Sequence, residues 1–121
     1  MNLRLSIGRL SLGIELSDTP TARAIMEKLP FTSTAQTWGE EVYFSTPVSA
    51  KLEPGAQQVV APGTVCFWTQ GDSIALPFGR TPMSTDERPK LANPCNVIGF
   101  LKDHASLKAV KAGDKIRVEK A

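Results

Sequence analysis

Hydrophobic and polar residues alternate at the start of the chain. Apolar residues occupy every second position over residues 3–7, and the same pattern returns over residues 10–16. A period of two places alternate side chains on one face of a β-strand. Gly8 and Arg9 separate the two runs, as the Gly-X pair of a tight turn does. The pattern predicts that the chain begins with a β-hairpin.

A helical period follows in the segment SDTPTARAIMEKLP. Thr19 or Asp18 is suited to cap the N-terminus of a helix, Pro20 to stand in its first turn, and Pro30 to end it. The apolar residues at helical spacing are Ala22, Ile25, Met26 and Leu29. We expect this segment to be the main helix.

The rest of the chain consists of short runs rich in β-branched and aromatic residues, divided by turn signals. The predicted strands are FTSTAQTW, EEVYFSTPV, TVCFW, SIALPF, NVIGFL and KIRVEK. EPGA and APGT mark turns, and SLKAVKAGD predicts one helical turn closed by Gly113. Many short strands with few helices predict an all-β (mainly β) protein whose sheet closes into a barrel, since closure removes exposed edges.

Length and charge narrow the classes of function. A chain of 121 residues fits one domain, residues 1–121, and its net charge is +2 with acidic and basic residues interspersed. That distribution favours a solvated surface and predicts no nucleic-acid partner. No run approaches the length of a membrane span, and the first residues lack the apolar core of a secretory signal. We therefore expect no membrane partner and a cytoplasmic location.

The titratable residues indicate neither a metal site nor a cofactor. Cys66 and Cys95 match no metal-ligand spacing, so free thiols in a reducing cytoplasm are expected. His104 is the single histidine, so we expect no zinc site. A catalytic pair of His104 with Cys66 or Ser84 is compatible with the spacing, but no pattern in the sequence supports it.

The aromatic residues gather in the middle of the chain, where all but Phe100 lie between residues 31 and 78. Phe31, Phe67 and Phe78 are expected to fill the core. Trp and Tyr carry a polar tip and often lie where an apolar surface meets water. The candidates for a pocket wall are therefore Trp38, Tyr43 and Trp68.

Glu40 and Glu41 look like a catalytic pair of carboxylates, but strand geometry opposes that interpretation. Neighbouring residues of a strand point to opposite faces. Glu40 is expected on the side of Val42, and Glu41 on the side of Tyr43. One carboxylate is expected to face a cleft and the other to be solvated, so paired acid–base catalysis is not expected.

Three strings of the sequence resemble a known family. LPFTSTAQTWGEEVYFSTPV, FWTQGDSIALPFGRTPMS and NVIGFL are similar to a small family of prokaryotic proteins of unknown function with a cyclophilin-like fold. The resemblance covers nearly the whole chain. It implies a closed eight-stranded cyclophilin-like β-barrel with one main helix and a short helical turn.

Cyclophilins are peptidyl-prolyl isomerases, and the resemblance raises the question of whether this chain keeps their chemistry. Their signature places Phe-His-Arg on a strand after the first helix, and the arginine hydrogen-bonds the prolyl nitrogen as the amide twists. The corresponding segment here, TAQTWGEEVYF, contains neither Arg nor His. Arg80 could supply a cation only from another strand. Fold alone does not imply activity, so isomerisation is the alternative and not the preferred function.

The preferred function is a non-catalytic binding module for a small molecule or peptide. Its groove is expected to be acidic and aromatic, and so to favour a cationic or amine-bearing ligand, with no catalytic residue, metal or cofactor. Residues 80–84 follow the apolar run SIALPF and Gly79, and they are expected at the rim of the groove. There Arg80 would hold a carboxylate or phosphate. The candidate ligand-binding residues are Trp38, Glu40, Glu41, Tyr43, Trp68, Arg80, Thr81, Pro82, Met83 and Ser84.

Two other functions stay open from the sequence. One is an enzyme, either a divergent isomerase using Arg80 or a hydrolase using Glu40, Glu41 or Ser84. The other is an assembly role, in which the apolar string LPF and Met83 form a homodimer contact.

Overall fold

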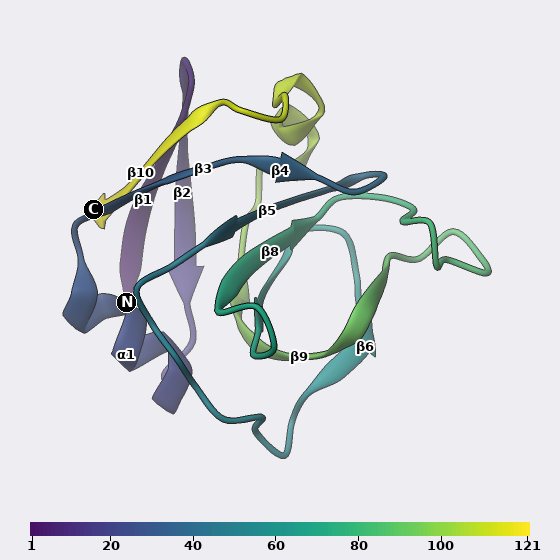
Figure 1. The fold of residues 1–121 in the computed structure, drawn as a ribbon, viewed down its shortest axis with the longest axis horizontal. Coiled ribbons are helices and arrows are strands. Elements are labelled where there is room, and N and C mark those ends of the chain that lie inside the picture. The colour runs from purple at the N-terminus through teal and green to yellow at the C-terminus, as the bar shows by residue number, and fades with distance from the viewer.

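Ten strands, one α-helix and one 3₁₀ helix form the protein, and the computed structural model describes all residues, 1–121 (Figure 1). The first elements are β1 (Asn2–Ile7), β2 (Leu10–Leu16), α1 (Pro20–Lys28), β3 (Phe31–Thr34), β4 (Gln36–Thr37) and β5 (Glu41–Ser45). They are followed by β6 (Gln57–Val59), β7 (Thr64–Trp68), β8 (Ser73–Pro77), β9 (Lys90–Phe100), η1 (His104–Ala109) and β10 (Lys115–Lys120).

The predicted hairpin and helix are confirmed. β1 and β2 pair antiparallel, and Gly8 turns between them with a φ of 55°, a conformation that glycine adopts without strain. In α1 the Thr19 side chain caps the helix by accepting a hydrogen bond from the Ala22 N–H, and Pro20 is the first helical residue. The helix ends at Lys28, so Leu29, expected within the helix, is its C-cap and directly precedes Pro30.

The sheet is a nearly closed barrel. Its path of paired strands runs β3-β10-β1-β2-β9-β7-β8-β5-β4. The two ends of this path, β3 and β4, are separated in the chain by Ala35 alone, whose N–H donates to the carbonyl of Asp114 at 2.8 Å. One bent segment therefore pairs with β10 at one end and with β5 at the other.

The number of strands differs from the expected eight. The path has nine strands because the segment predicted as one strand is divided at Ala35. β6 was not predicted and pairs with β9 outside this path. β9 begins at Lys90, six residues before the expected start at Asn96, because its first half pairs with β6 and its second half with β7 and β2.

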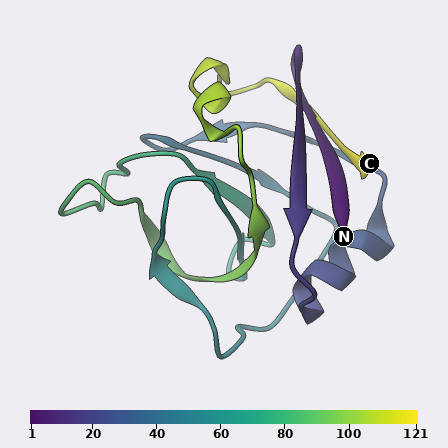
Figure 2. The ribbon, with the colours of Figure 1, turned by 180° about the vertical axis from the view of Figure 1, so that it is seen from behind.

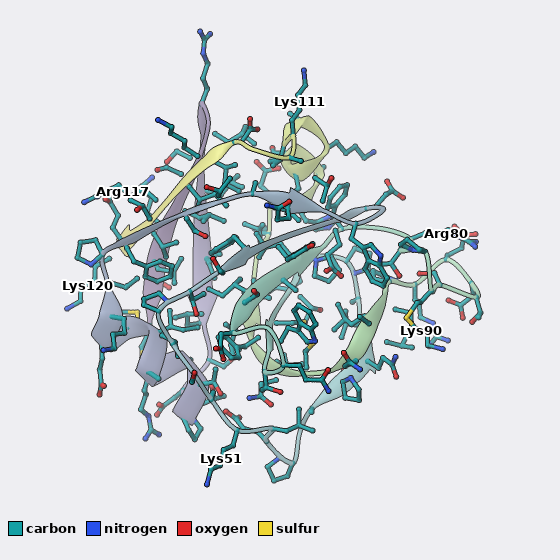
Figure 3. All side chains as sticks on the ribbon, in the orientation of Figure 1. Lys51, Arg80, Lys90, Lys111, Arg117 and Lys120 are labelled. Carbon is teal, nitrogen blue, oxygen red and sulfur yellow. The ribbon has the colours of Figure 1, made fainter.

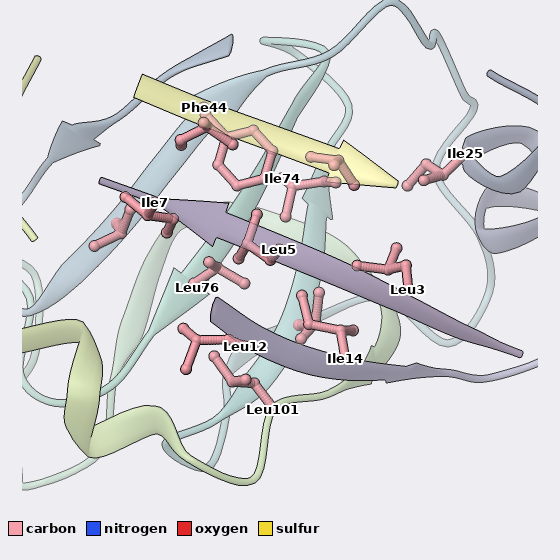
Figure 4. Close-up of a cluster of buried hydrophobic side chains, with 14 of the residues drawn as sticks. Leu3, Leu5, Ile7, Leu12, Ile14, Ile25, Phe44, Ile74, Leu76 and Leu101 are labelled. Atoms are coloured by element: carbon pink, nitrogen blue, oxygen red, sulfur yellow. The ribbon is translucent and has the colours of Figure 1, made fainter. Parts of the chain in front are cut away.

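The main core lies inside the barrel (Figure 4). Alternate residues of β1 and β2, among them Leu5 and Leu12, meet Phe44 of β5 and the inward residues of β7 and β8. Figures 1 and 2 show α1 and η1 at opposite ends of the barrel, where Ile25 and Leu107 are buried in this core. Its members are all apolar, as expected for a barrel filled by side chains.

Three neighbouring strands contribute to a second buried cluster on their other face. On β7, Phe67 belongs to the main core and Cys66 to the small cluster. On β8, Ile74 and Ala75 are divided in the same way, and β9 adds Cys95 to the small cluster. The period of two thus gives these strands two buried faces, and the second face supports the candidate site.

The long connection from β5 to β6 is tied down by one buried amide. The Asn96 side chain accepts from the Glu53 N–H at 2.7 Å and donates to the Lys51 carbonyl at 2.9 Å. It also donates to the Thr21 hydroxyl of α1 at 3.0 Å, and Thr21 donates in turn to the Glu53 carboxylate. A fully buried amide with its partners in place holds connection, helix and β9 together.

Candidate functional site

A pocket of about 220 Å³ opens on the second face of the barrel strands. β5 contributes Glu41 and Tyr43 to its wall, and β7 contributes Trp68. The remaining lining residues are Trp38, Ala75, Leu91, Ala92 and Cys95. The lining is thus almost wholly apolar, with a single residue that carries a formal charge.

The three side chains predicted as a pocket wall lie together here. Trp38, Tyr43 and Trp68 all line the pocket and are half-buried. The rings of Tyr43 and Trp68 meet edge to face, with centroids 6.4 Å apart and an interplanar angle of 85°. The Trp68 indole N–H donates to the Asn93 side-chain oxygen at 3.0 Å, which fixes this ring against β9.

Glu41 is the unusual member of the pocket. Its side chain lines the pocket although the residue is only 6% exposed, and its Oε1 atom is buried without a hydrogen-bond partner. Burial raises the pKa of Glu41 to about 7, because an ionised carboxylate loses its hydration there. A buried acceptor with no donor reduces the stability of the folded protein. A ligand that donates a hydrogen bond to this oxygen would remove that penalty and so bind more tightly.

Two thiols lie close to this carboxyl group. Cys95 lines the pocket and Cys66 belongs to the cluster beneath it, and both are free and buried. Burial raises the pKa of Cys95 to about 12, with a smaller contribution from Glu41. Burial likewise raises the pKa of Cys66 far above its ordinary value, to which Cys95 and Glu41 add. Thiols held in the neutral form are poor nucleophiles, so neither cysteine has the character of a catalytic residue.

Glu40 lies apart from the pocket and has a structural contact. It is exposed and stands in the turn before β5, and its Oε1 atom accepts from the Arg80 N–H at 3.3 Å. A Cβ atom on Gly79 would come within 2.5 Å of the same oxygen, so the glycine makes room for this carboxylate. As expected, one carboxylate faces the cavity and the other is solvated. Glu40 precedes β5, however, so it does not lie on the side of Val42, which is buried in the main core.

Residues 80–84, predicted as the rim of the groove, do not line this pocket. The Arg80 carbonyl accepts from the Glu40 N–H at 2.8 Å, and a Cβ on Gly39 would meet Pro82 at 2.9 Å. The segment therefore supports the turn that carries Trp38 from outside. Its polar groups also form hydrogen bonds with one another: the Ser84 hydroxyl accepts from the Thr81 N–H at 2.9 Å.

The other sequence-based candidates are not assembled into a site. Ser84 donates to the Arg88 carbonyl at 2.8 Å, and none of its hydrogen bonds involves His104. Of the expected dimer contact, Met83 is exposed, whereas Leu76 and Pro77 are buried. No group of three or more His, Cys, Asp or Glu side chains is placed to hold a metal ion. Neither helix is long and apolar enough to cross a membrane.

No cation lines the pocket. Arg80 is exposed and has a weak ion pair with Glu87, 3.7 Å between Nη1 and Oε1. Lys51 and Lys90, both labelled in Figure 3, do not line the pocket either. The group that stabilises a twisted prolyl amide in cyclophilins therefore has no counterpart among the lining residues.

The sequence did not indicate four of the lining residues. Leu91, Ala92 and Cys95 reach the pocket because the first half of β9 pairs with β6, a long-range contact with no local signal. Ala75 forms part of the wall because its strand alternates between two buried faces.

Barrel, end helices and pocket together define a protein of the cyclophilin-like class. A sequence model of the cyclophilin-like family matches residues 1–119, so the chain belongs to this family. Its structure is similar to the solution structure of a hypothetical protein from Archaeoglobus fulgidus, with a TM-score of 0.86. The two sequences are 39% identical, and the match covers 100% of this chain and 95% of the other. No curated protein matches the chain.

Proposed function

We propose that the protein is a non-catalytic binding module that holds a small molecule, or one side chain of a peptide, in the Glu41 pocket. The observation that carries the proposal is the composition of this pocket: three aromatic side chains and one buried, unpartnered carboxyl group around an open cavity. Apolar walls with a few fixed polar groups are typical of ligand sites. The volume of about 220 Å³ suits a group smaller than most drug-sized ligands.

The arrangement of the charges supports binding over catalysis. The lining residues include one carboxyl group and no cation, so no acid–base pair faces a substrate. The thiols nearby are neutral, and the Ser84 hydroxyl is used within its own loop. We also infer a cytoplasmic location in a prokaryotic cell, which the two free cysteines support.

The two tryptophans allow a direct test, because both line the pocket and the chain has no others. Toluene, phenol, 1-butanol and butylamine are added one at a time to ¹⁵N-labelled protein while the two indole N–H signals are followed. We expect at least one probe to shift both signals in a saturable way. If no probe shifts either signal, the proposal is wrong.

A matched pair of variants shows whether the pocket is responsible. Ala92 is exposed and lines the pocket, whereas Ala112 is exposed and does not. Ala92→Phe should fill the opening and weaken binding of the probe about tenfold or more, since the probe loses its apolar contacts. Ala112→Phe should leave binding unchanged. Equal effects of the two substitutions would contradict the assignment.

The non-catalytic part of the proposal has its own measurement. In a protease-coupled assay with a proline peptide, the protein should leave the rate at that of the uncatalysed exchange. Acceleration that disappears in Arg80→Ala would instead support the divergent isomerase.

A further inference from the structure

The lining of the pocket contains one acidic residue and no basic residue. Glu41 is the only lining residue with a formal charge, and none of the protein's ion pairs involves it. Burial of an ionised carboxylate is costly unless a cation or hydrogen-bond donor accompanies it. The protein itself supplies neither to Oε1. The missing partner is therefore a group that carries positive charge or N–H donors.

The walls of the pocket favour the same kind of group. Aromatic faces carry partial negative charge and attract cations, and indole rings do so most strongly. Two indoles and one phenol ring line this pocket together with Glu41. Leu91 and Ala75 supply apolar surface for a short hydrocarbon stem. A neutral carbonyl ligand would gain less, since its oxygen is not attracted to the faces of the rings.

We propose that the pocket binds a primary alkylammonium group, whose N–H donates to the Glu41 carboxylate while its stem lies against the aromatic and apolar walls. This inference rests on the proposed function and specifies its ligand. The same chemistry occurs in a free alkylamine and in a lysine side chain of a peptide. The pocket, of about 220 Å³, is large enough for either group. When the group is a lysine side chain, the rest of the peptide stays outside the pocket.

Binding of this kind is linked to release of a proton. With a pKa of about 7, Glu41 is mainly protonated in the free protein at pH 6 and must lose its proton to pair with an ammonium group. The other titratable groups that face it are Tyr43 from β5, Cys66 from β7 and Cys95 from β9. Both thiols stay neutral between pH 6 and 8, so the linkage in this range belongs to Glu41.

The test compares three probes on the full-length protein at pH 8, with the two indole N–H signals as the readout. Butylamine has the stem and the ammonium donors, 1-butanol has the stem without the charge, and tetramethylammonium has the charge without a donor. We expect butylamine to bind about tenfold or more tightly than each of the others, because a hydrogen bond to a charged group adds to stem contact.

Two neighbouring glutamates provide the matched variants. Glu41→Gln keeps the shape but loses the charge, and it should abolish the preference for butylamine over 1-butanol. Glu40→Gln removes the same charge from an exposed residue outside the pocket, so it should keep the preference. Butylamine should also bind the wild-type protein more tightly at pH 8 than at pH 6, and this gain should be absent in Glu41→Gln. The pH series on the wild-type protein tests the inference even if the variant does not fold.

The outcomes separate the inference from the proposed function. If 1-butanol and butylamine bind equally well, the ammonium inference is wrong and the binding pocket stands. The ammonium inference would also be wrong if tetramethylammonium bound as tightly as butylamine and Glu41→Gln left its binding unchanged. If no probe shifts the indole signals, both proposals fail. Nα-acetyl-lysine amide distinguishes the sources: tighter binding than butylamine indicates a lysine side chain, and weaker binding indicates a free amine.

Discussion

Adjacent residues of β7 and β8 lie on opposite faces of the sheet, and the two faces differ in physical character. Phe67 and Cys66 are adjacent on β7, yet Phe67 lies in the main core and Cys66 in the cluster beneath the pocket. The main core is apolar throughout and surrounded by the barrel and its end helices. The small cluster adjoins an open cavity and a buried carboxyl group that lacks a partner.

The difference shows which face is optimised for stability. Close packing without voids is what protein interiors normally achieve, and the barrel interior follows that rule. The pocket face keeps a cavity and an unpaired acceptor, both of which cost free energy in the folded protein. Features that reduce stability are commonly retained at functional sites. This contrast is the physical reason for placing function on the second face.

The largest expected effect tests the two faces of β7 directly. Phe67→Ala should lower the free energy of unfolding by about 3–5 kcal/mol, because it leaves a large cavity in a sealed core. Cys66→Ala removes one sulfur atom on the other face and should cost only about 1 kcal/mol. Urea unfolding of both variants measures the difference. Similar losses for the two would show that the faces are energetically alike.

The second prediction concerns the dependence of stability on pH. The folded protein holds the Glu41 proton up to a pKa of about 7, whereas the unfolded chain releases it at the ordinary value for Glu. The proton on Glu41 therefore contributes to the free energy of unfolding. This contribution is fully present below pH 4 and is lost as the pH rises through 7. The loss corresponds to about 3 kcal/mol for this shift.

Glu41→Gln should remove this loss, so the variant should gain in stability relative to the wild-type protein as the pH rises from 4 to 8. Glu40→Gln is the matched control and should follow the wild-type curve. The measurement is urea unfolding at several pH values. A wild-type curve parallel to that of Glu41→Gln would mean that the carboxylate is hydrated or paired, and the contrast between the faces would weaken.

The smallest expected effect concerns the orientation of one ring. Asn93→Ala removes the acceptor of the Trp68 indole N–H and should lower the free energy of unfolding by about 1 kcal/mol. The Trp68 indole N–H signal should move toward the position of a solvent-exposed indole, while the Trp38 signal stays in place. If neither signal moves, the hydrogen bond does not fix the ring.

The sequence predicted those parts of the fold that depend on local patterns. Alternation over residues 3–7 and 10–16 defines the first hairpin, and the cap at Thr19 defines the helix. The first half of β9 lacks alternation and contains Pro94, so its strand depends on pairing with β6. Distant pairing of that kind leaves no local signal. The division of one strand at Ala35 likewise follows from closure of the sheet.

The candidate site could also be predicted only as far as local patterns determine it. Strand parity alone places Glu41 beside Tyr43, as the structure has them. The position of Glu40 does not follow from parity, because β5 begins one residue later. Residues 80–84 were expected at the groove because they leave the end of an apolar strand after Gly79. Their hydrogen bonds within the loop and to the turn before β5 leave them outside the lining. Such loop geometry depends on tertiary contacts that composition does not reveal.

The alternation of β5, β7 and β8 has a consequence for how the protein can change. Exchange of one pocket residue leaves the neighbouring core residues where they are, so ligand preference is free to diverge by single substitutions. Insertion or deletion of one residue within these strands would exchange the two faces and turn Phe44 and Phe67 outward. Divergence at this site is therefore confined to changes of residue type at constant strand length.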